Sequence, residues 1–445
     1  MGAGTAQGGA CLLISGKVRK NMEFVVFAGV LLLLFIFMIV QELIQTKNQE
    51  KLFKKYLREN YGKEPPKEYS LERFARLGSY LERHKEEKQL DDITWNDLGM
   101  DEVFRRIDRT YSAAGEEYLY YTLRNISCGR EALEHLEEVV NWLQEQENIK
   151  VRIQLLMKRL GHLGKYSLYD YLDNLDYLGE RSNRKIVLGN LLYLPFLLLL
   201  FVQPAMGTIG IVLCMLWHIM TYFREKKVIE PYIISFAYVL RLIDVCEELE
   251  KQKIPVYRRE LDELREALKS LRELRRGAYW VMAGNQGKIG GNPLDILADY
   301  LRMILHLDIF QFNRMLEKLR KKTGQVENML AITGYLDMAI SVGGFRKSLE
   351  GYCIPKLEED TEKAFLHMKK GWHPLLSQPV KNSIRADRGI LLTGSNASGK
   401  STFLKMVAVN AVLAQTIHTC AAESYHAPIF QIFSSMALRL SLIHI

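Results

Sequence analysis

Residues 186–223 constrain the fold most, because this stretch contains no Asp, Glu, Lys or Arg. Residues 203–207 (Gln-Pro-Ala-Met-Gly) divide it into two halves near the minimum length of a membrane-spanning helix, and the proline and glycine favour a tight turn. Basic residues flank it on both sides, which places both ends in the cytoplasm: Arg181, Arg184 and Lys185 before it, and Arg224, Lys226 and Lys227 after it. The sequence therefore predicts a transmembrane helical hairpin whose turn faces outward. Two core helices of a soluble protein are the alternative, although they would not need basic residues at both ends.

A second uncharged stretch, Phe24 to Val40, is also about long enough to cross a bilayer. It predicts a transmembrane anchor over residues 23–41 rather than a cleaved signal, because no small-residue cleavage pattern follows it. The basic residues before it favour a cytoplasmic N-terminus, whereas the hairpin requires residues 42–180 to be cytoplasmic. Four lysines follow the anchor and favour an external N-terminus: Lys47, Lys51, Lys54 and Lys55. We expect a multi-pass protein of the cell membrane with its other regions in the cytoplasm.

The composition limits the class of protein, its partners and its metal or disulfide sites. The 445 residues are 48% hydrophobic and 25% charged, which is typical of a folded protein. A net charge of +8 permits an acidic partner such as DNA or anionic lipid, but basic residues beside membrane segments contribute to this excess. The six cysteines are scattered without C-x-x-C pairs and predict neither a zinc site nor a disulfide framework: Cys11, Cys128, Cys214, Cys246, Cys353 and Cys420.

Leucines at positions 261, 264, 268, 271 and 274 recur at helical spacing and predict an amphipathic helix that ends at Gly277. We interpret this helix as a packing element rather than a partner-binding zipper, because a coiled coil needs three or four sustained heptads. Residues 293–322 and 325–345 also have helical spacing, after a glycine-rich connector at 284–291. The region after the hairpin is therefore expected to be predominantly α-helical as far as Ile390.

Residues 394–402 match the G-x-x-x-x-G-K-[ST] spacing of a phosphate-binding loop. Residues 389–393 are expected to form a buried strand before it, and residues 403–415 a helix after it, with Leu404, Val407 and Leu413 on its apolar side. In this arrangement backbone N–H groups surround the phosphates, Lys400 reaches the outer phosphates, and the Ser401 hydroxyl binds Mg²⁺. The predicted ATP and Mg²⁺ site comprises Gly394, Ser395, Asn396, Ala397, Ser398, Gly399, Lys400, Ser401 and Thr402.

The loop resembles the phosphate loop of the MutS family, which also has asparagine at the third position and Lys-Ser-Thr at the end. Residues 371–376 and 380–383 resemble the His-Pro and Asn-containing segments that precede that loop. Residues 108–121 are similar to the start of the MutS core, and residues 334–339 to the helix that returns from the lever to the ATPase domain. The similarity covers roughly residues 92–439, apart from the hairpin, and the whole arrangement resembles the membrane-associated MutS-related proteins of bacteria.

The resemblance implies a mainly α fold, a MutS-like helical core and lever with transmembrane helices, followed by the N-terminal part of an α/β P-loop ATPase domain. It adds His373 and Asn382 as nucleotide-pocket residues. The expected organisation is a tail (1–22), an anchor (23–41), a linker (42–91), the first part of the core (92–180), the hairpin (186–223), the second part of the core with the lever (224–370), and a truncated ATPase domain (371–445).

The implied function is that of a membrane-anchored, ATP-dependent DNA-binding ATPase similar to mismatch-repair proteins, which forms a homodimer in its full-length form. The alternative is a nucleotide-binding membrane scaffold that does not engage DNA. Residues 47–91 leave no room for mismatch-reading domains between anchor and core. After Arg439 the sequence departs from the family without an acidic Walker B strand, so we expect a truncated chain that binds ATP weakly and does not hydrolyse it.

Overall fold

The structure is a computed structural model that describes residues 37–38, 40–41, 44–64, 69–86, 88–126, 129–163, 166–275, 300–359, 364–395 and 399–435. The chain forms two units, Met1–Asn60 and Tyr61–Ile445, and residues 44–60 of the first unit are helical. Several predictions concern residues outside the described ranges: nearly all of the anchor at 23–41, the tail at 1–22, the connector at 284–291, the helix end at Gly277 and the loop residues 396–398.

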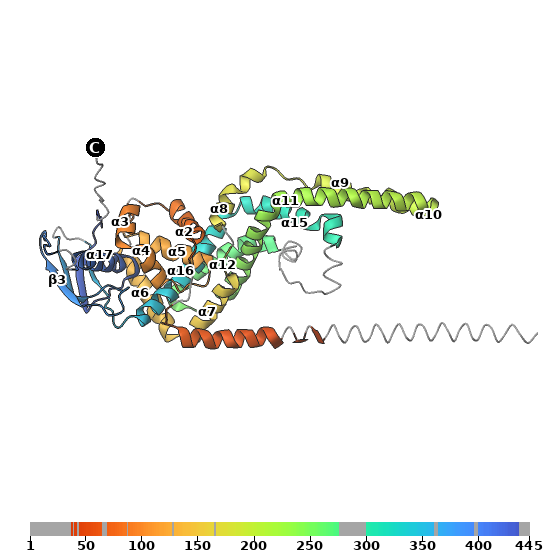
Figure 1. Ribbon diagram of the computed structural model, residues 1–445. Helices are drawn as coiled ribbons and strands as arrows, with labels where there is room; N and C mark the ends of the chain where they lie inside the picture. Colours follow the sequence, from red (N-terminus) through yellow and green to blue (C-terminus); the bar gives the residue numbers. More distant parts are fainter. Residues whose placement is uncertain are drawn as a thin grey trace, which may run out of the picture. The chain divides into compact units, whose positions relative to one another are not determined.

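The second unit is mainly α-helical, which confirms that part of the predicted fold class (Figure 1). Its α-helices in chain order are α2 (Leu71–Arg83), α3 (Asp92–Leu98), α4 (Met100–Ile107), α5 (Ala113–Arg124), α6 (Arg130–Glu145), α7 (Glu147–Leu160), α8 (Leu168–Asp173), α9 (Arg184–Leu191), α10 (Tyr193–Val202), α11 (Pro204–Glu250), α12 (Arg258–Leu271), α15 (Leu307–Arg320), α16 (Thr323–Ser348) and α17 (Lys400–Ile417). Short 3-10 helices cover Asn174–Leu178, Pro255–Tyr257 and Arg272–Arg275.

Helices α5 and α16 pack closely at the centre of this unit. A Cβ on Gly334 of α16 would lie 2.6 Å from the carbonyl oxygen of Ala114 on α5, so only glycine permits this approach. Asp337 of α16 accepts hydrogen bonds from the Ser112 hydroxyl (2.6 Å) and the Ser112 backbone N–H (2.9 Å), just before α5 begins. Residues 108–121, which resemble the start of the MutS core, and residues 334–339, which resemble the helix that returns from the lever, therefore lie directly against each other.

Residues 71–83 belong to this core rather than to a linker, which differs from the prediction. Ser70 caps the start of α2, and Leu77 is fully buried. Arg76 donates to the buried carboxylate of Glu116 on α5 at 2.7 Å. A buried carboxylate needs such a partner, which holds α2 against α5.

Helices α9, α10 and α11 form the predicted helical hairpin (Figure 1). Its turn is shorter than expected: only Gln203 lies outside the helices, because Pro204 already occupies the first turn of α11. Proline suits this position since the first helical N–H groups have no intrahelical partner. A Cβ on Gly207 would lie 2.6 Å from the backbone nitrogen of Leu200, so the two helices meet closely next to the turn.

A four-stranded sheet contains β1 (Lys356–Glu358), β2 (Leu366–Gly371), β3 (Asn382–Ala386) and β4 (Ser424–Pro428) in the order β1-β4-β2-β3. Strand β1 pairs with β4 in parallel, and the other two pairs are antiparallel. The region before Ile390 is predominantly α-helical as expected, but its helices end at Ser348, and three strands that were not predicted precede Ile390. These strands are short and rich in polar residues, so their sequences carry little strand signal.

The predicted strand at 389–393 is also wrong. These residues are irregular and exposed, and the side chain of Leu391 is 89% exposed. A strand requires hydrogen bonds to a neighbouring strand, and no strand pair in the described part of the chain includes this segment. The amphipathic helix is confirmed as α12, which buries Leu261, Leu264 and Leu271.

Candidate nucleotide-binding site

The predicted phosphate loop leads into α17. Gly399 adopts a left-handed backbone conformation (φ 83°) as the N-cap, and the helix starts at Lys400. Glycine adopts this conformation without strain, which explains the second glycine of the motif. No side chain caps this helix start, so N–H groups of its first turn can bind an anion.

Lys400 folds back over the start of the loop. Its ammonium group donates to the backbone carbonyls of Gly394 and Ser395, the latter at 2.8 Å. Ser401 and Thr402 lie exposed in the first turn of α17. The structure therefore brings together the lysine, the hydroxyl groups and the helix N-terminus of the predicted site, while residues 396–398 lie outside the described ranges.

His373 lies near the first turns of α17 and is mostly buried. Burial, assisted by the charge of Lys405, lowers its pKa, so the imidazole is neutral at neutral pH. Asn410 of α17 holds this segment in place: its amide nitrogen donates to the carbonyl of Trp372 at 3.0 Å, and its amide oxygen accepts from the N–H of Ala421 at 2.7 Å. Nδ1 of the neutral His373 accepts a hydrogen bond from the Leu375 N–H at 3.3 Å, which leaves Nε2–H as a donor.

Asn382 lies at the start of β3, which has one neighbour in the sheet. Its side chain is exposed and donates to the carbonyl of Val380 at 3.0 Å. It therefore stabilises the turn before β3, and no hydrogen bond of the described residues links it to the loop. The predicted helix at 403–415 is confirmed, with Leu413 buried, but Leu404 is exposed and does not lie on the apolar side.

Sequence reasoning missed the side chain that connects α17 to the helical core. Arg346 of α16 is buried and donates to the Thr419 hydroxyl (2.8 Å), to the His418 carbonyl (3.0 Å) and to the carboxylate of Glu137 on α6 (2.7 Å). These contacts fix the C-terminal end of α17, where a cation also interacts favourably with the helix dipole. One arginine near the end of an apolar helix gives no sequence signal of this role.

Glu137 forms a cluster with Arg346, Thr419 and His418, which we call the Arg346 cluster. Burial favours a higher pKa for its carboxyl group, but hydrogen bonds from His418 and Arg346 outweigh burial and lower the pKa to about 2. The carboxylate is therefore charged at neutral pH and holds Arg346 in place. These contacts link the C-terminal end of α17 to α6 and α16.

Similar sequences occur among mismatch-repair proteins, although no protein-family model matches the chain. The DNA mismatch repair protein MutS of Acholeplasma laidlawii is 32% identical over 124 residues, which cover 27% of this chain and 14% of that protein. The protein of the same name from Listeria monocytogenes is 32% identical over 129 residues, with the same coverage. Human MutS protein homolog 4 is 28% identical over 123 residues, which cover 26% of this chain and 12% of that protein.

The chain thus matches only about one seventh of the length of these bacterial relatives. The similarity nevertheless recurs among bacterial and mammalian proteins of one family at about 30% identity. Over about a quarter of its length, this chain is related to the MutS family.

Proposed function

We propose that this chain belongs to a membrane-anchored protein that binds ATP with Mg²⁺ at residues 394–402 and uses nucleotide binding to control contacts of its helical core with DNA. The observation that carries the proposal is the geometry at the start of α17, where Lys400 lies over Gly394 and Ser395 beside an uncapped helix N-terminus. The relationship to the MutS family supports it.

The residues described at the start of α17 suit the phosphates of a nucleoside triphosphate. The N–H groups at the start of α17 would bind phosphate oxygens, and the ammonium group of Lys400 would exchange its two carbonyl partners for phosphate. The Ser401 hydroxyl would hold Mg²⁺, which neutralises phosphate charge when bound. We assign no hydrolytic residue to the described part of the chain.

The Arg346 cluster supports coupling between this site and the helical core. The loop adjoins one end of α17, and Arg346 binds the other end while also contacting α6 through Glu137. A movement of α17 on nucleotide binding would therefore shift its contacts with α16 and α6. In this proposal α17 carries the signal from the nucleotide to the core.

Nucleotide binding is tested with a fluorescent ATP analogue and the full chain. Lys400→Ala should weaken binding at least tenfold, because the ammonium group contacts the outer phosphates. The matched control is Lys356→Ala, an exposed lysine on β1, which should leave affinity unchanged. Equal affinity of the wild-type and Lys400→Ala proteins would contradict the proposed site.

DNA binding is proposed because several relatives are DNA mismatch repair proteins. Contacts to DNA would be largely to phosphates, so duplex affinity should fall steeply between 50 and 200 mM salt, by roughly 10³-fold for six phosphate contacts. Absent or salt-independent binding would favour the alternative, a nucleotide-binding membrane scaffold. A homodimer is expected from the family resemblance and is measurable by light scattering.

We also propose that α9–α11 anchor the protein in the cell membrane, with the core and the nucleotide site in the cytoplasm. Among the described residues, two stretches are long and apolar enough to cross a membrane, Arg184–Val202 and Pro204–Glu250. Large apolar side chains are exposed on both sides of the turn, including Leu198, Phe201 and Leu213. An exposed apolar surface of this kind is typical of a membrane or protein contact.

A further inference from the structure

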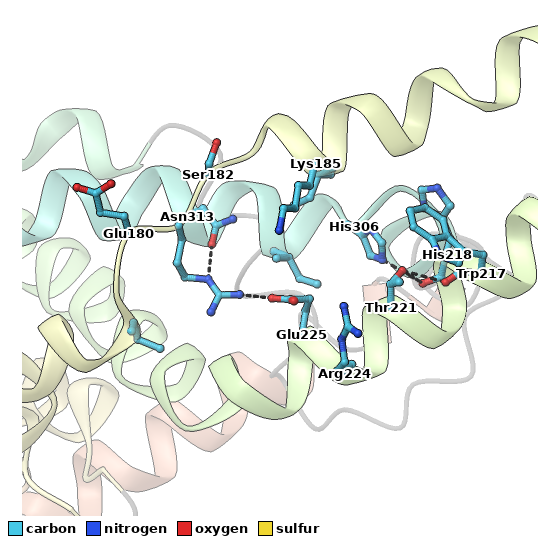
Figure 2. A pocket seen from close by; sticks show the side chains of 14 residues that line it. Glu180, Ser182, Lys185, Trp217, His218, Thr221, Arg224, Glu225, His306 and Asn313 are labelled. Atoms are coloured by element: carbon cyan, nitrogen blue, oxygen red, sulfur yellow. Dashed lines mark hydrogen bonds and ion pairs between the residues drawn. The ribbon is translucent and has the colours of Figure 1, made fainter.

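A cavity of about 400 Å³ with both polar and apolar lining lies at the base of the hairpin, at the end opposite the Gln203 turn. Its lining comes from three parts of the chain: the segment before and at the start of α9, the middle of α11, and the start of α15 (Figure 2). A cavity of this size accommodates a small polar group such as a phosphate ester.

Cations dominate one side of this cavity. Arg181 is already bound, since its guanidinium donates to Glu225 and, at 3.1 Å, to the side-chain oxygen of Asn313. Lys185 and Arg224 point into the space between α9 and α11 (Figure 2), and neither forms an ion pair with another described residue. The carboxylate of Glu180 lies apart from them in the same view. Among the described residues, two unpaired cations, Lys185 and Arg224, therefore outnumber the one unpaired carboxylate of the lining, Glu180, and the net positive charge favours an anion.

His218 provides an independent observation. It lines the cavity and is fully buried, yet neither of its ring nitrogens has a hydrogen-bond partner. The ring stacks on His306 with centroids 5.0 Å apart, and a Cβ on Gly189 would approach it to 3.2 Å. A buried polar group without a partner is costly, so a histidine held this tightly suits a cavity that receives a polar ligand.

The position of the cavity indicates the kind of anion. The 19 residues of Arg184–Val202 span about 28 Å as a helix, close to the thickness of the hydrocarbon core of a bilayer. The cavity adjoins Arg184, so in an inserted hairpin it would lie at the level of the headgroups. Trp217 lines it and is half exposed, and tryptophan is enriched at this interface. A ligand at this level would carry an anionic group next to apolar chains.

We propose that this cavity binds the phosphate headgroup of an acidic phospholipid. Lys185 and Arg224 pair with the phosphate, His218 forms a further hydrogen bond, and Trp217 packs against the glycerol and the adjoining acyl carbons. This inference rests on the proposed insertion of the hairpin into the membrane. A soluble phosphate ester shares the same anionic chemistry, and the experiment separates the two sources.

The test uses the full chain purified from membranes in an uncharged detergent, where no membrane surface potential contributes. Native mass spectrometry measures binding of phosphatidylglycerol, phosphatidylcholine and water-soluble glycerol phosphate. We expect phosphatidylglycerol to bind at least tenfold more tightly than either of the others. Lys185→Gln combined with Arg224→Gln should weaken its binding roughly thirtyfold, because two cations near the headgroup are lost.

The control pair is Arg184→Gln with Lys227→Gln, which removes the same charge from residues outside the cavity lining and should change binding less than threefold. Equal effects of the two pairs, or equal binding of the two lipids, would overturn the inference. Glycerol phosphate that binds as tightly as phosphatidylglycerol would overturn the assignment to lipid. Extraction of the wild-type protein from membranes by alkaline carbonate would instead contradict membrane anchoring itself, so the two failures are distinguishable.

Discussion

The two halves of α11 have similar apolar side chains in opposite surroundings. Near its start, Leu213 and Met220 are exposed, whereas Phe236 and Leu242 farther along the same helix are buried among α-helices of the core. The helix continues through both regions, past Pro231, without a break. Apolar content alone therefore does not distinguish a membrane helix from a core helix; the packing partners do.

The largest expected effect is a difference between two phenylalanines of α11. Phe236 is 1% exposed and packs against Phe312 with ring centroids 4.7 Å apart, whereas Phe223 is 60% exposed. Phe236→Ala should lower the free energy of unfolding of the core by about 3–5 kcal/mol. Phe223→Ala should change it by less than about 0.5 kcal/mol, as exposed substitutions usually do. Urea unfolding in detergent measures both, and equal losses would remove the distinction between the two halves.

A charge in the exposed half should prevent insertion of the hairpin. Leu213→Arg is expected to disfavour insertion by about 3 kcal/mol, because arginine near the centre of a membrane helix is unfavourable by that amount. Leu213→Ile is the control and should insert normally. The measurement is protection of the hairpin from protease in sealed vesicles, and full protection of the Leu213→Arg hairpin would contradict a membrane location.

A change in pH should alter the stability of the core and leave the stability of the hairpin unchanged, since residues 186–223 contain no acidic side chain. Burial raises the pKa of Glu117 on α5 to about 8. The unfolded chain releases this proton near pH 4.5, so the folded state loses stability as pH rises from that value through 8. Between pH 5 and pH 7 the loss should be roughly 2–3 kcal/mol. In Glu117→Gln this pH dependence should disappear; its persistence there would assign the effect to another group.

The smallest effect concerns closure of the hairpin. In Gly207→Leu the new side chain would meet the backbone of Leu200, which cannot rotate away, so we expect a loss of about 1–3 kcal/mol. Ala205→Leu, at an exposed position in the same turn of α11, should be neutral. Unfolding in SDS followed by circular dichroism compares them, and equal stability of the two variants would argue against close packing of α10 and α11.

Features that depend on local sequence were predictable. The hairpin followed from a long run without charges, α12 from the spacing of its leucines, and the start of α17 from the glycine–lysine motif. The longer turn predicted at 203–207 was wrong because Pro204 can begin a helix as readily as it can occupy a turn.

Features that depend on distant partners were not predictable. Strands β1 to β3 are defined by pairing with one another or with β4, and the apolar run at 389–393 lacks such pairing among the described residues. Arg346 and Asn410 acquire their roles from carbonyl groups brought near them only by the fold. A helical polar residue has many structural uses, so its sequence position does not reveal its partner.

We propose above all that α9–α11 form a membrane hairpin within a chain related to the MutS family. The most direct test introduces Gln203→Cys at the turn, in a protein in which Cys11 is replaced by serine, and labels intact cells with a membrane-impermeant maleimide. Lys227→Cys, beyond the other end of the hairpin, is the control. We predict that the cysteine at position 203 is labelled in intact cells and the one at position 227 only after lysis. Labelling of both positions only after lysis would contradict the account.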